Sequence, residues 1–245
     1  MTAAAITRPP MRRLTTGELR KMTDTRSGFW LLVSVGLSAL AVVVLVLTVG
    51  GSDDRTFDSM FGDCVGIVSV LLPIVGLLVV TSEWSQRTAL TTFTLVPERA
   101  RVVTAKLLAG CVLALLAVVA SLAFAALGNL IASGSWDFTL THLLGGALYE
   151  LFGMLGALAL GLLIMHSAAA IVTYFVLPTV VGIVTGVVTA LHDPAKWIEP
   201  TQSTGPLADG TVHGADWAHF AVTVGVWVVL PLVLGLLRLR RHELK

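Results

Sequence analysis

The chain has few charged side chains for its length. Asp, Glu, Lys and Arg make up 13% of its 245 residues, whereas a typical soluble domain carries about 25%. Hydrophobic residues make up 56%, and the mean hydropathy is +0.88. One buried core cannot absorb so large an apolar excess, so we expect much of the surface to face lipid. The composition therefore argues against an ordinary soluble domain.

Cysteines and catalytic motifs are scarce as well. Two cysteines indicate no disulfide framework, and Cys64 and Cys111 fall near opposite ends of neighbouring apolar runs, too far apart to bond. The sequence contains no Gly-Lys pair, so it lacks the phosphate-binding loop needed to hydrolyse ATP. It also lacks Gly-x-Ser-x-Gly and His-Glu-x-x-His, and its histidines match no metal-binding spacing. We therefore expect no metal site, bound cofactor or catalytic residue in this chain.

Long apolar runs are what the sequence does contain. A helix needs about 20 mostly apolar residues to cross the hydrocarbon core of a bilayer. Residues 151–192 contain no Asp, Glu, Lys or Arg and are too long for one span, so we place a turn at His166 and Ser167. The runs predict an all-α membrane protein with six transmembrane helices, at about residues 28–50, 64–81, 107–133, 140–165, 168–191 and 217–237.

The basic residues predict the orientation of these spans. Lys and Arg gather in cytoplasmic segments. With six spans, an N-terminal arm (1–27), the connection between spans two and three, and the chain from Arg238 lie on one side. Only Arg55 and Lys196 of the 16 basic residues fall elsewhere. We expect a single transmembrane domain (28–238) with a cytoplasmic arm and tail (239–245). The high Ala, Val, Leu and Gly content suggests a bacterial plasma membrane.

Two extramembrane segments carry helix signals. Thr15 and Glu18 have the spacing of a capping box, which predicts a basic helix from there to about Thr25, lying along the inner membrane surface. Between spans two and three, Leu90, Phe93 and Val96 have helical spacing and Pro97 follows them. We interpret this second segment as an amphipathic contact helix; the alternative is an ordinary inner loop.

This connection resembles the cytoplasmic coupling region of ABC-2-type transporter permeases, the membrane subunits of one class of ABC exporter. The residues that fit the family pattern are Glu83, Thr88, Pro97, Arg101 and Lys106. Arg87 stands where glycine is common in that family. The resemblance covers the whole chain in topology and about 40 residues in motif.

The resemblance implies a permease whose ATPase is a separate polypeptide. Two ATPase copies, holding ATP and Mg²⁺, would dock on the coupling region of a dimer formed with a second or homologous permease. No nucleic acid partner is implied. An apolar face and a charged rim suit such docking. The predicted coupling residues are Glu83, Arg87, Thr88, Leu90, Phe93, Val96, Pro97, Glu98, Arg99 and Arg101.

Three features inside or beside the spans are further candidates. Glu150 is the only charged residue deep within a predicted span, so it is either a pathway residue or a neutral structural acid facing the bundle interior. Gly182 and Gly186 form a G-x-x-x-G that serves either a dimer contact or packing within one subunit. In the resembling family, an outer loop like that at 192–216 folds as short helices that cap the exit.

Other functions share part of this evidence. A membrane enzyme needs polar residues gathered at one depth, and the sequence offers only Glu150. A membrane anchor or sensor for a cytoplasmic partner has the same topology as a permease. A secondary transporter usually has more spans or inverted repeats, which we do not find here. The sequence favours an exporter permease and leaves its substrate open.

Overall fold

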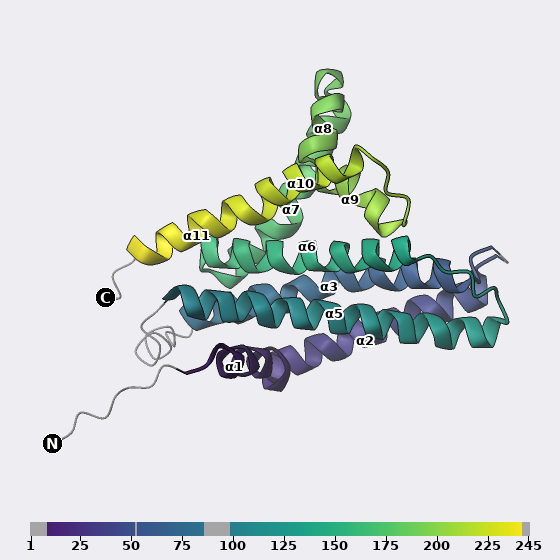
Figure 1. Cartoon of the computed structure of the whole chain (residues 1–245), viewed down its shortest axis with the longest axis horizontal. Coiled ribbons are helices and arrows are strands. Elements are labelled where there is room, and N and C mark those ends of the chain that lie inside the picture. The colour runs from purple at the N-terminus through teal and green to yellow at the C-terminus, as the bar shows by residue number, and fades with distance from the viewer. Residues whose placement is uncertain (1–8, 52, 86–98, 242–245) are drawn as a thin grey trace.

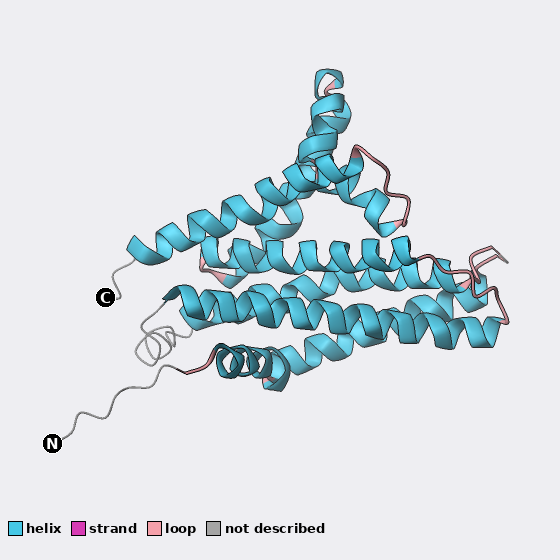
Figure 2. Cartoon of the chain, in the orientation of Figure 1, coloured by secondary structure: helices cyan, strands magenta, loops and turns pink. Residues whose placement is uncertain are grey.

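The protein is helical throughout the part of the chain that the computed structural model describes, residues 9–51, 53–85 and 99–241 (Figures 1 and 2). No strand occurs in these ranges. Six of the helical segments are long and apolar enough to cross a membrane. These findings confirm the prediction of an all-α membrane protein with six apolar spans.

The spans follow the apolar runs with small shifts at their ends. The first five are α2 (Arg26–Val49), α3 (Phe57–Ser85), α5 (Arg99–Ala132), α6 (Leu140–Ile164) and α7 (Ser167–Val187). The sixth comprises α10 (Asp216–Val224), the π-helical segment η2 (Gly225–Val229) and α11 (Leu230–Arg241). Between them lie η1 (Thr189–Leu191), α8 (His192–Ile198) and α9 (Pro200–Ala208).

Several helix ends differ from the ends of the predicted spans. Helix α3 extends beyond residues 64–81 at both ends and α5 begins before residue 107, and the added turns bring Glu83 and Lys106 together. Helix α7 ends at Val187, short of residue 191. By contrast, the turn between α6 and α7 falls where it was predicted: Met165 has a φ of 58°, and the His166 Nδ1 accepts a hydrogen bond from the Ala169 amide.

Helices α2, α3, α5 and α6 run side by side and form the core (Figure 1). Small residues allow them to approach closely. A Cβ at Gly76 of α3 would meet Met154 of α6 at 2.7 Å, and one at Gly128 of α5 would meet Val43 of α2 at 2.6 Å. Interfaces built on glycine are common between membrane helices, where close van der Waals packing drives association.

Helix α1 (Met11–Asp24) packs across this bundle near the first turns of α5. The predicted capping box is wrong, because α1 begins at Met11 and both Thr15 and Glu18 lie within it. Thr25 instead caps the next helix, since its hydroxyl accepts a hydrogen bond from the Gly28 amide. Met22 is fully buried, so α1 is part of the packed body.

Helix α7 and the sixth span diverge from the bundle and carry the short helices α8 and α9 between them (Figure 1). The end of α3, the start of α5 and the end of α11 lie at the same end of the bundle, with α1 nearby (Figure 1). The segments that hold most of the basic residues therefore adjoin one end of the molecule.

Candidate functional site

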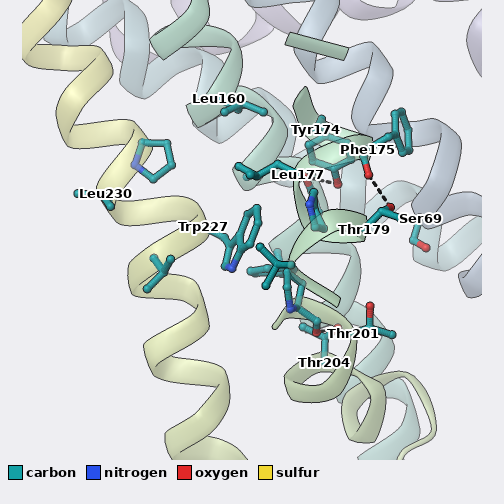
Figure 3. Close-up of a pocket in the computed structure, with 18 of the residues that line it drawn as sticks. Ser69, Leu160, Tyr174, Phe175, Leu177, Thr179, Thr201, Thr204, Trp227 and Leu230 are labelled. Carbon is teal, nitrogen blue, oxygen red and sulfur yellow. Dashed lines mark hydrogen bonds between the residues drawn. The ribbon is translucent and has the colours of Figure 1, made fainter. Parts of the chain in front are cut away.

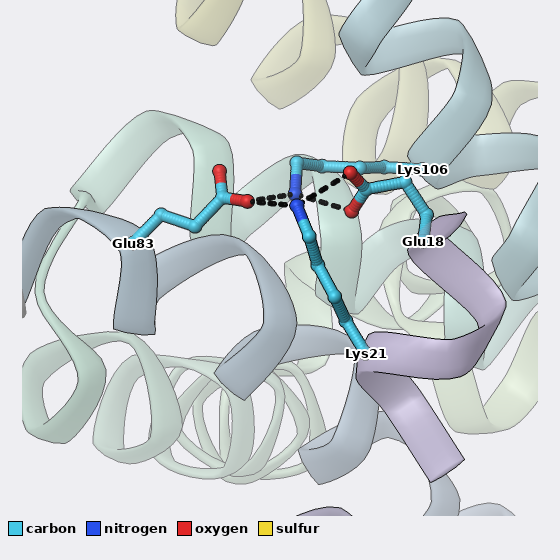
Figure 4. Close-up of polar contacts among 4 residues, drawn as sticks. All are labelled: Glu18, Lys21, Glu83 and Lys106. Atoms are coloured by element: carbon cyan, nitrogen blue, oxygen red, sulfur yellow. Dashed lines mark hydrogen bonds and ion pairs between the residues drawn. The ribbon is translucent and has the colours of Figure 1, made fainter. Parts of the chain in front are cut away.

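Four charged side chains from three helices meet beside α1 (Figure 4). We name Glu18 and Lys21 of α1, Glu83 of α3 and Lys106 of α5 the charge cluster. Each lysine Nζ lies between the two carboxylates: Lys21 is 2.7 Å from Glu18 and 2.8 Å from Glu83, and Lys106 is 2.7 Å from Glu18 and 2.9 Å from Glu83. Two acids and two bases thus alternate, and the cluster carries no net charge.

The charge cluster is largely withdrawn from solvent. Glu18, Glu83 and Lys106 are buried, and only Lys21 remains partly exposed. Burial lowers the pKa of Lys21, but its hydrogen bonds to Glu18 and Glu83 outweigh this effect and raise the pKa above its ordinary value. Removing one partner from a buried ion pair typically costs about 3–5 kcal/mol, because the other charge is left without compensation. The cluster therefore holds α1, α3 and α5 in one relative position.

The position of the charge cluster connects it to the predicted coupling region. Glu83 lies two residues before the end of α3, and Lys106 lies two turns into α5, so the two flank residues 86–98. Arg101 adds a further tie, because its Nη2 donates to the Pro9 carbonyl at 2.6 Å. Charged contacts therefore join α1 to the two helix ends that flank residues 86–98.

Most predicted coupling residues lie outside the described ranges. They are Arg87, Thr88, Leu90, Phe93, Val96, Pro97 and Glu98. Arg99 begins α5, and Glu83 and Arg101 take part in the contacts given above. Sequence reasoning assigned Glu18 to a cap and missed its ion pair with Lys106. A lysine at the start of a membrane span was the available signal, since such a charge needs a partner.

Glu150 occupies the middle of α6 and is 1% exposed. It shares the face of α6 that carries Gly146 and Met154, which pack against α3 and α5. Neither of its carboxyl oxygens has a hydrogen-bond partner among the described residues. An unpaired polar group at this depth costs free energy unless it has another use. The expected interior location is therefore present, and the choice between pathway and structural roles stays a hypothesis.

Gly182 and Gly186 have different surroundings. A Cβ at Gly182 would lie 3.6 Å from the Glu199 carboxylate, whereas one at Gly186 would meet nothing within 4 Å. Glu199 is buried and caps α9 by accepting hydrogen bonds from the amides of Thr201 and Gln202. A Cβ at Gly182 would thus make only an ordinary van der Waals contact with the same subunit, and Gly186 lies exposed on α7.

The predicted exit cap at 192–216 contains the short helices α8 and α9. Helix α9 is fastened to α6 at two places. The Leu207 carbonyl lies directly over Gly145, and His142 joins the Ala208 carbonyl through Nε2 at 2.8 Å. The other ring nitrogen of His142 lies 2.8 Å from a carboxylate oxygen of Asp58 in α3. Sequence reasoning did not foresee this joint, which unites three distant segments.

A cavity of about 540 Å³ lies between α6, α7, α9 and the sixth span (Figure 3). Its volume is within the range of small-molecule sites, about 300–1,000 Å³. Side chains such as Leu160, Leu177 and Leu230 make most of its wall apolar, and Thr201 and Thr204 lie at the end opposite Leu160 (Figure 3). Nothing in the sequence predicted this cavity.

Within residues 9–51, 53–85 and 99–241, no three His, Cys, Asp or Glu side chains gather as a metal site requires. Cys64 and Cys111 are both free.

The chain matches no model of a known protein family, and no curated protein is significantly similar to it.

Proposed function

We propose that this chain is the membrane-spanning permease subunit of an ABC exporter of the ABC-2 type. Two copies, or one copy with a homologous permease, form the pathway, and two copies of a separate ATPase bind ATP and Mg²⁺ and drive transport. The chain itself contains no phosphate-binding loop. We place it in a bacterial plasma membrane with both termini in the cytoplasm, because the basic segments adjoin one end of the bundle.

The charge cluster is the observation that carries this proposal. A permease driven from outside needs a point where force on a cytoplasmic segment reaches several spans together. Glu83 and Lys106 flank residues 86–98. Lys21 of α1 pairs with Glu83 at 2.8 Å, and Glu18 of α1 pairs with Lys106 at 2.7 Å. A helix at 86–98 with Leu90, Phe93 and Val96 on one side would give an ATPase a surface to grip.

Affinity purification tests the proposal. The tagged chain is isolated in mild detergent from its own cells, and the proteins that accompany it are identified and counted. We expect a protein with a phosphate-binding loop, near one copy per permease chain, and expect it to be lost in Phe93→Ala and Pro97→Ala. Phe29→Ala is the matched control, since Phe29 is an exposed aromatic residue of α2.

Recovery of the chain alone in several detergents, with no ATPase activity, would contradict the proposal. It would favour an activity of the chain by itself, with Glu150 as the first residue to examine.

A further inference from the structure

Among the residues that the structure describes, those that line the cavity include no Asp, Glu, Lys, Arg or His. Its polar groups are also largely occupied within the protein. The Tyr174 hydroxyl donates to the Gly153 carbonyl at 3.3 Å, the Thr179 hydroxyl donates to the Phe175 carbonyl at 2.7 Å, and the Trp227 indole donates to the Ile198 carbonyl at 2.8 Å. A ligand would therefore be recognised by apolar contact more than by directional hydrogen bonds.

Helix irregularities border this space. The sixth span has a π-helical turn at Gly225–Val229, and Pro231 follows it. Proline has no N–H, so the Trp227 carbonyl cannot make its ordinary helical bond to residue 231. This carbonyl faces Gly156 of α6, where a Cβ would lie 3.6 Å away. Such π-turns are frequent at functional sites.

The cavity reaches the outer surface of the helix bundle. Leu177, Leu230 and Leu234 line it and are nevertheless exposed. Val180 and Val233, on the same two spans, are exposed as well. A surface of this kind on membrane-spanning helices faces the bilayer hydrocarbon. The open side of the cavity is therefore accessible to a molecule dissolved in the membrane.

We propose that the cavity between α6, α7 and the sixth span binds one hydrocarbon chain of an amphipathic lipid that enters sideways from the bilayer. The hydrocarbon chain of the lipid lies along Leu160 and Leu230, and the more polar end of the lipid lies toward Thr201 and Thr204 (Figure 3). The lipid is either a bilayer component or the exported substrate, since both offer the same chain. The proposal does not require the ATPase, so it stands or fails separately from the proposed function.

Photocrosslinking tests the site. The chain is placed in nanodiscs of phosphatidylglycerol and phosphatidylethanolamine that contain a trace of phosphatidylethanolamine with a diazirine in one acyl chain. We expect labelled peptides to concentrate on cavity residues of α6, α7 and the sixth span. Labelling spread evenly over exposed residues such as Leu37, Leu116 and Val119 would overturn the proposal.

Two matched variants sharpen the test. Leu160→Trp fills the cavity, and Leu144→Trp makes the same change on the exposed surface of α6 away from it. We expect Leu160→Trp to lower cavity labelling by about tenfold, equivalent to about 1.4 kcal/mol, and Leu144→Trp to leave it unchanged. Equal labelling of wild type and a folded Leu160→Trp would contradict the proposal. If Leu160→Trp does not fold, the wild-type labelling map decides.

A further measurement distinguishes a bilayer lipid from the exported substrate as the occupant of the cavity. Native mass spectrometry of the detergent-purified wild-type chain is expected to find retained phospholipid when the occupant is a bilayer component. When the occupant is the substrate, cavity labelling is expected to fall once the ATPase partner and ATP are added. Labelling confined to the cavity supports the hydrocarbon-chain site whichever source these readouts identify, and diffuse labelling rejects it.

Discussion

Helix α3 and helix α7 are both apolar membrane-spanning segments, but they are packed very differently. In the most apolar stretch of α3, 61% of the residues are buried, whereas in α7 only 11% are. Helix α3 is surrounded by α2, α5 and α6 and ends at the charge cluster. Helix α7 contains Pro178, lines the cavity and presents most of its surface outward.

The difference in packing distinguishes a rigid region around α3 from a loosely packed region around α7. Close glycine contacts and four short ion pairs fix the α3 side as one unit that can transmit a displacement. The α7 side has an internal cavity, a π-turn and two prolines, Pro178 and Pro231, which remove helical hydrogen bonds. If the proposed function holds, the first region responds to the ATPase, and the second accommodates a ligand.

The largest expected effect is in the charge cluster. Lys106→Met removes the buried cation that lies between Glu18 and Glu83, and we expect the free energy of unfolding to fall by about 3–5 kcal/mol. Thermal unfolding of the purified chain in detergent measures it. An unchanged midpoint of thermal unfolding would show that the charge cluster does not stabilise the fold.

Two controls accompany that substitution. Lys196 pairs with Asp193 at 3.0 Å on the exposed surface, so Lys196→Met should change stability by about 0–1 kcal/mol. Adding Glu83→Gln to Lys106→Met restores charge balance and should recover part of the lost stability, because Glu18 and Lys21 still pair. A double variant less stable than the single one would argue against charge balance as the cause.

A smaller loss is expected where α9 packs on α6. A Cβ at Gly145 would collide with the Leu207 backbone, so Gly145→Ala should lower stability by about 1–3 kcal/mol. Gly66→Ala in α3, where a Cβ meets nothing within 4 Å, should be neutral or stabilising by up to about 1 kcal/mol. The same unfolding assay compares them, and equal effects of the two changes would rule out a close contact at Gly145.

Substitution of Glu150 is expected to raise the free energy of unfolding, whereas the substitutions above lower it. Because its carboxyl has no partner among the described residues, Glu150→Leu should raise stability by about 1–3 kcal/mol, while Glu150→Gln should change it less. Vesicle transport separates the two roles. Loss of transport in a stabilised Glu150→Leu would indicate a pathway residue, whereas full transport by Glu150→Gln at every pH tested would leave only the structural role.

The smallest effect is expected at the outer joint. His142→Leu removes the contact with Asp58 and the hydrogen bond to the Ala208 carbonyl, and loss of the hydrogen bond is expected to cost about 0.5–1.5 kcal/mol. His192→Leu, which removes a 3.3 Å contact from an exposed histidine to the Gly186 carbonyl, is the control. If both variants unfold at the same midpoint, α9 is held by its packing and not by His142.

The spans were predictable because membrane hydrocarbon imposes a length and a composition on any helix that crosses it. The end of α3 and the start of α5 were not predictable. A charged residue ends an apolar run in a hydropathy profile, and the profile does not show that Glu83 and Lys106 neutralise each other. Glu18 illustrates the same limit. Its local spacing to Thr15 suggested a cap, but its partner Lys106 lies 88 residues away.

The cavity and the outer joint lay further beyond sequence reasoning. A π-turn at Gly225–Val229 has no clear sequence signature, and the cavity depends on how three separate helices diverge. His142 was visible only as an isolated histidine, since Asp58 and Ala208 reach it from other segments. Such sites arise from tertiary packing and not from local pattern.

The most direct test of the account is the ATP hydrolysis rate of the copurified ATPase, measured alone and with the chain in nanodiscs. We expect the wild-type chain to change this rate. We also expect Glu83→Gln combined with Lys106→Met still to bind the ATPase but no longer to change its rate, because the two ion pairs that join the flanks of residues 86–98 to α1 are lost. An ATPase rate indifferent to the wild-type chain, or fully altered by the double variant, would contradict it.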